Sequence, residues 1–132
     1  MILSDFIASM NRLGQEKVPF LFIVDFELKN PLIVKLDEVD SKEILYSING
    51  FTNASIKATG NKIKIERFPG TLSDYSRKFS KVLEYLEYGD TFLTNLTVTT
   101  EVKLGCSLHD IFGQSEAKYK LLFKNQFLVF SP

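Results

Sequence analysis

The chain has 132 residues, 45% of them hydrophobic, and its 16 basic and 16 acidic residues give a formal net charge of zero. This size and composition fit one domain with enough apolar side chains for a core. Zero net charge argues against general electrostatic binding to nucleic acid, because such binding needs a basic surface. No apolar run reaches the roughly 18 residues that a membrane helix needs, so we expect no membrane span.

A single cysteine and a single histidine limit the chemistry of the chain. Cys106 has no internal disulfide partner, and the first residues lack the basic flank and apolar core of a signal peptide, so we expect a cytoplasmic location. The usual zinc ligand sets are excluded, and no metal site is expected. Cys106 and His109 are close enough in sequence to form a catalytic pair, but a loop cysteine and a helix-start histidine explain them more simply.

The N-terminal part predicts a short helix followed by an apolar strand. Ser4 is expected to cap this helix and Gly14 to end it. Apolar side chains recur on one face of the helix, at Phe6, Ile7, Met10 and Leu13. Residues 20–26 are almost entirely apolar, which is typical of a strand buried on both faces. Asp25 interrupts this run, and it faces either solvent and local amides at the strand end or a ligand.

Two further strands and a hairpin are expected in the first half of the chain. Residues 32–36 follow the turn at Asn30-Pro31, and residues 43–49 end at Asn49-Gly50. The residues after Asn49-Gly50 do not alternate in polarity, so this dipeptide predicts a turn without fixing a tight hairpin. A clearer hairpin joins residues 55–59 to residues 62–68, with one covered face and one solvated face.

Residues 73–100 predict a helix, a glycine stop and a strand, and the rest of the chain is arranged around this unit. Apolar side chains at helical spacing form one face, at Tyr75, Phe79, Val82 and Leu86. Ser73 or Asp74 can cap the start, and Gly89 can end the helix in the left-handed conformation. Residues 91–100 are rich in Thr, Val, Phe and Leu, which predicts a strand.

Asn95 is the most unusual polar residue of that predicted strand, because its amide needs hydrogen-bond partners there. It either bonds to a neighbouring loop or lines a pocket. Elsewhere the chain has no glycine-rich phosphate loop, no nucleophile beside a base and no pair of acids placed for proton transfer. We therefore expect no catalytic residue in it.

The C-terminal part predicts a short helix and a terminal hairpin. Ser107 and Asp110 have the spacing of a capping box. Residues 119–124 and 127–130 are expected to pair as strands. Lysines beside aromatic residues here fit either stacking on nucleic acid bases or, more simply at zero net charge, the solvated face of an edge hairpin, so no nucleic-acid partner is expected. A strand as apolar as residues 127–130 at the terminus predicts a chain cut inside a larger fold, with an unpaired edge that favours self-association.

Several segments occur in the order found in the N-terminal part of chorismate-using enzymes. They are Met10-Asn11-Arg12-Leu13-Gly14, residues 19–26, residues 85–97, Ala117-Lys118-Tyr119-Lys120 and Phe130-Ser131-Pro132. The most specific of them, Gly89-Asp90-Thr91-Phe92-Leu93-Thr94-Asn95-Leu96, is similar to the family pattern Gly-Asp-x-aromatic-x-x-Asn-Leu. The chain most resembles component I of aminodeoxychorismate synthase, to which component I of anthranilate synthase is related.

This resemblance implies an α+β fold of two sheets face to face, with mostly antiparallel strands and helices outside. Residues 1–132 would be a single N-terminal fragment, without the C-terminal catalytic half. The parent would aminate chorismate for para-aminobenzoate and folate synthesis, with magnesium and with ammonia from a glutamine amidotransferase, component II. The family's Pro-x-Lys-Gly-Thr-type segment and magnesium-binding glutamates do not occur here. The chain alone is therefore expected to be inactive and to hold no cofactor.

The resemblance also implies a candidate ligand site. Members of the family hold a tryptophan-type ligand near a Leu-Leu-acid-Ser strand, which here reads Ile23-Val24-Asp25-Phe26, with phenylalanine in place of serine. Thr94 also replaces a common glutamine. The candidate ligand-binding residues are Asp25, Phe92 and Asn95, and no catalytic residue is carried over. The alternative to an enzyme fragment is a self-contained, non-catalytic binding or interaction domain.

Overall fold

The computed structural model describes residues 2–55 and 63–131, and it shows an α+β fold in which all paired strands of this part are antiparallel. In chain order the elements are α1 (Leu3–Gln15), β1 (Phe20–Ile23), β2 (Leu32–Lys35), the 3₁₀ helix η1 (Leu36–Glu38), β3 (Ile44–Ile48), β4 (Phe51–Thr52), β5 (Ile65–Phe68), α2 (Leu72–Tyr88), β6 (Glu101–Leu104), α3 (Leu108–Gln114), β7 (Tyr119–Phe123) and β8 (Phe127–Ser131). The described helices include none that is both long and apolar enough to cross a membrane. The expected fold class is confirmed.

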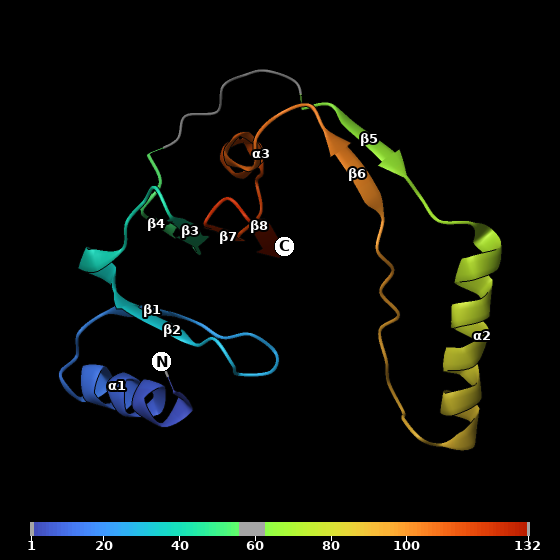
Figure 1. The fold of residues 1–132 in the computed structure, drawn as a ribbon, viewed down its shortest axis with the longest axis horizontal. Coiled ribbons are helices and arrows are strands. Elements are labelled where there is room, and N and C mark those ends of the chain that lie inside the picture. The colour runs from blue at the N-terminus through green and yellow to red at the C-terminus, as the bar shows by residue number, and fades with distance from the viewer. Residues whose placement is uncertain (1, 56–62, 132) are drawn as a thin grey trace.

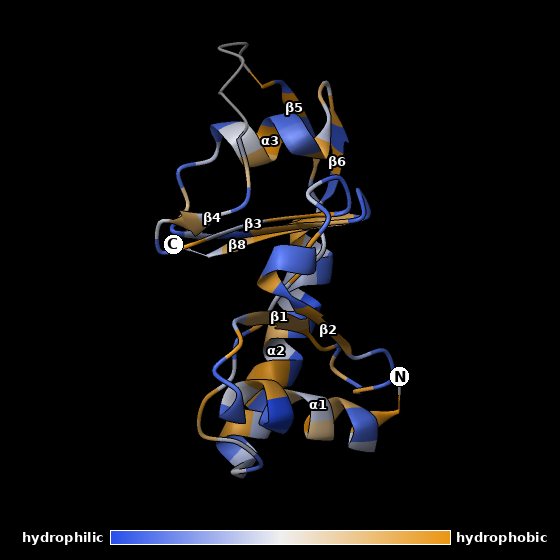
Figure 2. Cartoon of the chain, turned by 90° about the vertical axis from the view of Figure 1, so that its left-hand side faces the viewer, coloured by the Kyte–Doolittle hydropathy of each residue, from blue (hydrophilic) through white to orange (hydrophobic). Residues whose placement is uncertain are grey.

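Two sheets face each other, with a helix on the outer side of each (Figure 1). β1 and β2 form a two-stranded sheet that α1 covers, while β4, β3, β7 and β8 form a four-stranded sheet in that order, which α3 covers. Figure 2 shows the same succession from the side, from α3 through the four-stranded sheet and the β1–β2 sheet to α1. The core proper lies under α3, because alternate residues of the central strands point to that face.

Leu45, Phe112 and Leu122 form this core, and Leu122 is only 1% exposed. Leu45 and Leu122 are direct partners across the β3–β7 ladder, so both side chains leave the sheet on the α3 side. Phe112 from α3 closes over them. One helix turn and two strands from distant parts of the sequence thus share one apolar cluster.

The Asn49-Gly50 turn closes a tight hairpin. Ile48 pairs with Phe51, and both turn residues have positive φ, 50° for Asn49 and 92° for Gly50, which is the conformation that suits a two-residue hairpin. Asn53 then continues the edge of β3 with its side chain. Its Oδ1 accepts from the Tyr46 amide at 2.9 Å, and its Nδ2 donates to the carbonyl of residue 44 at 2.8 Å.

The capping box at α3 is confirmed. The Asp110 amide donates to the Ser107 hydroxyl at 3.1 Å, and the Ser107 amide donates to the Asp110 carboxylate at 3.0 Å. The terminal hairpin is also confirmed, with β7 and β8 paired from Phe123 and Phe127 outward. β8 is an edge strand of the four-stranded sheet, because its other side has no partner strand in the described part of the chain.

Four predictions for the N-terminal part are wrong. Ile2 is the residue before α1 and gives no side-chain cap, so Ser4 lies inside the first turn, and Gly14 lies inside the last turn. β1 ends at Ile23, because the chain turns into a loop around Asp25. The strand is also not buried on both faces, since Phe22 stays half exposed in a sheet of only two strands.

Residues 65–104, here called the arm, contain β5, α2 and β6 and extend away from the two sheets (Figure 1). β5 pairs with β6, which lies about 35 residues further along the chain, so residues 65–68 pair there and not in the expected local hairpin. Part of that prediction, residues 56–62, lies outside the described residues. All four residues of β5 are exposed, so a covered face is also wrong.

For α2, the predicted N-cap is wrong and the predicted C-cap is confirmed. Thr71, not Ser73 or Asp74, is the N-cap residue, and its Oγ1 accepts from the Asp74 amide at 3.1 Å. Gly89 ends the helix with φ 89°, which confirms the left-handed stop. None of the 17 residues of α2 is buried.

The predicted strand over residues 91–100 is wrong. These residues have no regular secondary structure, and the strand starts only at Glu101. Among the described residues, no backbone hydrogen bond joins residues 92–99 to another part of the chain. Strand propensity was not enough, because a strand forms only where a neighbouring strand supplies the hydrogen bonds.

Candidate functional site

An apolar groove of about 350 Å³ lies between β1 and the four-stranded sheet, on the face opposite α3. Its volume falls in the range that holds small organic molecules. Three strands of the larger sheet and one strand of the smaller sheet line it. The lining residues are Leu21, Phe22, Ile23, Ile48, Tyr119, Lys120, Leu121, Val129, Phe130 and Ser131.

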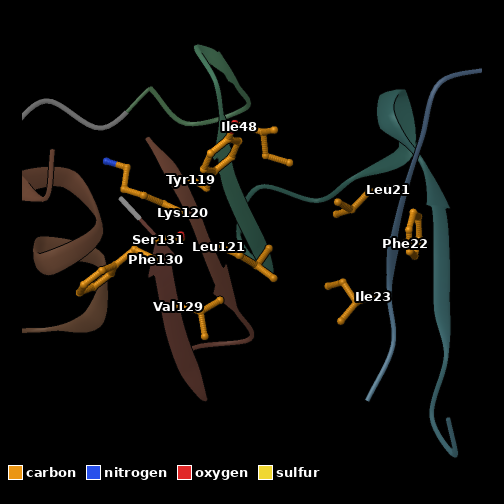
Figure 3. Close-up of a pocket in the computed structure, with 10 residues that line it drawn as sticks. All are labelled: Leu21, Phe22, Ile23, Ile48, Tyr119, Lys120, Leu121, Val129, Phe130 and Ser131. Atoms are coloured by element: carbon orange, nitrogen blue, oxygen red, sulfur yellow. The ribbon is translucent and has the colours of Figure 1, made fainter. Parts of the chain in front are cut away.

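The alternation of side chains along the strands shapes the groove (Figure 3). Leu21 and Ile23 point from β1 toward the larger sheet, while Leu121 and Val129 point back from a directly paired position of β7 and β8. Phe22 points the other way. Its ring packs edge to face on the ring of Phe6 in α1, with the ring centroids 6.4 Å apart. β1 therefore contributes one face to the groove and the other to the packing of α1.

Lys120 has its ammonium group engaged at the end of α3 rather than in the groove (Figure 3). Its Nζ donates to the carbonyl oxygen of Phe112 at 2.7 Å and to that of Ser115 at 2.8 Å. The same Nζ lies 4.7 Å from the centroid of the Phe112 ring. A cation at the C-terminus of a helix complements the partial negative charge there. The groove is left with mainly apolar walls, which suit binding rather than acid–base chemistry.

Asp25 closes the loop that follows β1. Its carboxylate accepts from the amide of Lys29 at 2.8 Å and from the amide and side chain of Asn30, each at 3.0 Å. The Lys29 amide is the main reason why the pKa of Asp25 is lowered below 3.8. Of the two readings for Asp25, the local amides are the contacts that the structure shows, and Asp25 does not line the groove.

Phe92 and Asn95 lie together in the segment after α2, apart from Asp25. Phe92 is 96% exposed, and Asn95 is also exposed. Neither residue lines the groove. The structure therefore does not bring the three candidate residues into one site, and ligand binding by them stays a prediction. Within residues 2–55 and 63–131, no cluster of three or more acidic, histidine or cysteine side chains could hold a metal ion.

The residues that do form the groove were missed at the sequence level. Leu121 and Val129 sit in strands that were predicted, and their alternation with Leu122 and Leu128 assigns them to the face opposite the core. What the sequence did not reveal is that β1 would face them, because that contact joins segments about 100 residues apart.

Comparison with known proteins gives two similar chains. The chain is 36% identical over 127 residues to an "Uncharacterized PabA-like protein" of Haemophilus influenzae, covering 96% of this chain and 39% of that protein. It is 32% identical over 134 residues to a protein of the same description from Pasteurella multocida, covering 100% of this chain and 41% of that protein. The chain thus spans about two fifths of the length of these relatives. No protein-family model matches it. No solved structure matches it significantly.

Proposed function

We propose that the chain is the N-terminal portion of a chorismate-binding protein of the aminodeoxychorismate synthase component I type, which acts in the synthesis of para-aminobenzoate. The observation that supports this most is similarity along the whole chain to proteins named PabA-like that are about two and a half times as long. The Gly89-to-Leu96 motif and the arrangement of two sheets with outer helices agree with it.

In this proposal the chain alone does not aminate chorismate. The groove is apolar and Lys120 is engaged by the end of α3, so the described residues offer no acid–base pair at a common site. Among the described residues, no three acidic, histidine or cysteine side chains come together as a metal site. The remainder of the protein would supply the reacting groups and the magnesium ion in the cytoplasm, with ammonia from a glutamine amidotransferase.

The proposal is tested with three proteins: this chain, the Haemophilus influenzae relative, and a chimera in which this chain replaces the matched segment of that relative. Each is incubated with chorismate, ammonium and magnesium, and products are separated by chromatography. We expect aminodeoxychorismate from the relative and the chimera and none from the chain. A folded relative and chimera that leave chorismate unchanged would refute the chorismate assignment. Turnover by the chain at the rate of the relative would refute its inactivity.

The groove favours a second candidate function, a self-contained module that binds a small apolar or aromatic molecule. The groove is open on one side, but its mainly apolar walls gain free energy by burying such a ligand. The test is methyl NMR of the chain with L-tryptophan as the probe. Shifts confined to the groove residues, which are lost in Leu121→Gln and kept in the exposed control Leu93→Gln, would support this function. Unchanged spectra at millimolar probe would exclude an L-tryptophan site.

A further inference from the structure

The arm exposes an apolar helix face that nothing in the described part of the chain covers. Its side chains at helical spacing are Tyr75, Phe79, Val82, Leu83 and Leu86. None of them is buried, and no other helix or strand packs extensively on α2. Most helix stability in proteins comes from packing of the apolar face, and α2 lacks that packing here.

The surface area of the chain shows how much packing is lacking. The chain exposes 10488 Å², whereas a compact monomer of 15.1 kDa would expose roughly 7,100 Å². The excess of roughly 3,400 Å² is about four times the roughly 800 Å² that each partner buries in an interface of standard size. Pairing with a second copy through one helix face would therefore leave most of the excess exposed.

The segment after α2, residues 92–99, lacks a neighbouring strand in the described part of the chain to pair with its backbone. Residues 92–99 have no regular secondary structure but are rich in strand-forming residues. Apart from the bond that the neighbouring Thr91 hydroxyl donates to the Leu93 carbonyl, their backbone makes no hydrogen bond to another described segment. Phe92 and Leu93 within it are 96% and 90% exposed. Unpaired backbone beside exposed apolar side chains is the arrangement that accepts an added strand.

We infer that the arm is a docking element for polypeptide equivalent to the three fifths of the relatives that this chain does not match. That polypeptide buries the apolar face of α2 and pairs with residues 92–99, which then become a β-strand. The size of the exposed surface and the greater length of the relatives both favour this occupant over a second copy. The inference rests on the proposed function only for the identity of the occupant, and docking requires no reaction with chorismate.

Amide hydrogen exchange tests the docking directly. We compare this chain with the Haemophilus influenzae relative, reading the peptides that align with Leu72–Tyr88 and with residues 92–99. We expect exchange in the relative to be slower by about 100-fold or more, because docked segments open only with the surrounding structure. Equally fast exchange in both proteins would overturn the inference. So would slow exchange in this chain that appears only with dimerisation, which would assign the arm to a second copy.

Matched variants in the chimera separate docking from a general loss of folding. Phe79→Glu places a charge on the apolar face, whereas Ser80→Glu places the same charge one residue further on the solvated side of α2. We expect Phe79→Glu alone to restore fast exchange in α2 while α3 stays protected. Equal behaviour of the two variants would contradict docking through this face. If docking holds but no protein aminates chorismate, the proposed function fails and the inference stands.

Discussion

The rings of Tyr75 and Phe79 stack on each other, with their centroids 6.1 Å apart and their planes 16° from parallel, on a helix that has no buried residue. Each ring covers part of the other, but both remain more than 40% exposed. Two aromatic side chains one helix turn apart supply a large apolar area for packing. Their exposure on α2 is the clearest sign that this surface functions as an interface.

The core under α3 should respond strongly to truncation of Leu122. Leu122→Ala leaves a cavity beside Leu45 and Phe112, and we expect the free energy of unfolding to fall by about 2 to 5 kcal/mol. Urea unfolding followed by far-UV circular dichroism measures this loss. Leu93→Ala makes the same change at an exposed position and should shift the free energy by less than about 0.5 kcal/mol. Equal losses in the two variants would contradict the assignment of the core.

Lys120 should stabilise the end of α3. Lys120→Met keeps much of the apolar stem but removes the two hydrogen bonds to the carbonyl oxygens of Phe112 and Ser115. We expect the free energy of unfolding, measured with urea, to fall by about 1 to 2 kcal/mol. Lys118→Met is the control, because the ammonium of Lys118 only lies over the Tyr119 ring at 5.6 Å. If Lys118→Met lowered the free energy of unfolding as much as Lys120→Met, the hydrogen bonds of Lys120 to the end of α3 would not be the cause.

Asp25 should make the loop after β1 sensitive to acid. Its pKa is lowered below 3.8 by the Lys29 amide above all, so its hydrogen bonds stabilise the loop fully above about pH 4 and are lost as the pH falls through the folded-state pKa. An NMR titration of the Asp25 carboxyl and the Lys29 amide should give a midpoint below 3.8. In Asp25→Asn, the chemical shift of the Lys29 amide should no longer change over this pH range. A midpoint at or above 3.8 would show that these bonds do not form.

The free edge of β8 should lead to self-association at high concentration. An unpaired edge strand offers backbone groups to another chain, and β8 also exposes Val129 and Phe130. Sedimentation velocity should show a concentration-dependent dimer that Val129→Lys weakens, because a charge on an edge strand opposes pairing. Leu36→Lys, outside the sheet edge, should leave it unchanged. A single sedimenting species with the mass of the monomer at all concentrations would refute edge pairing.

Local signals in the sequence predicted much of the fold correctly. Gly89, the Asn49-Gly50 turn and the Ser107–Asp110 capping box each depend on the conformation of a few adjacent residues, and each appears at the expected place. The α+β class, which the resemblance to chorismate-using enzymes implied, is also confirmed. Such features need no knowledge of distant partners, which is why one sequence was sufficient to predict them.

The errors concern features that depend on distant partners. β5 was assigned to a local hairpin, but it pairs with β6 across the whole of α2. Residues 91–100 were assigned to a strand, although no neighbouring strand is present in the described chain to pair with them. The groove was missed for the same reason, since it forms only where β1 meets β7 and β8. Propensity identifies segments that can form strands, and the partner decides whether they do.

The central claim is that polypeptide outside this chain covers the apolar face of α2, and a thiol placed on that face measures it most directly. Cys106→Ser removes the native thiol, and Phe79→Cys or Ser80→Cys then introduces a single new one. The rate of modification by a thiol reagent is measured in this chain and in the chimera with the Haemophilus influenzae relative. We predict that Phe79→Cys reacts rapidly in the chain and about 100-fold more slowly in the chimera, while Ser80→Cys reacts at similar rates in both. Rapid reaction of Phe79→Cys in both proteins would contradict the claim.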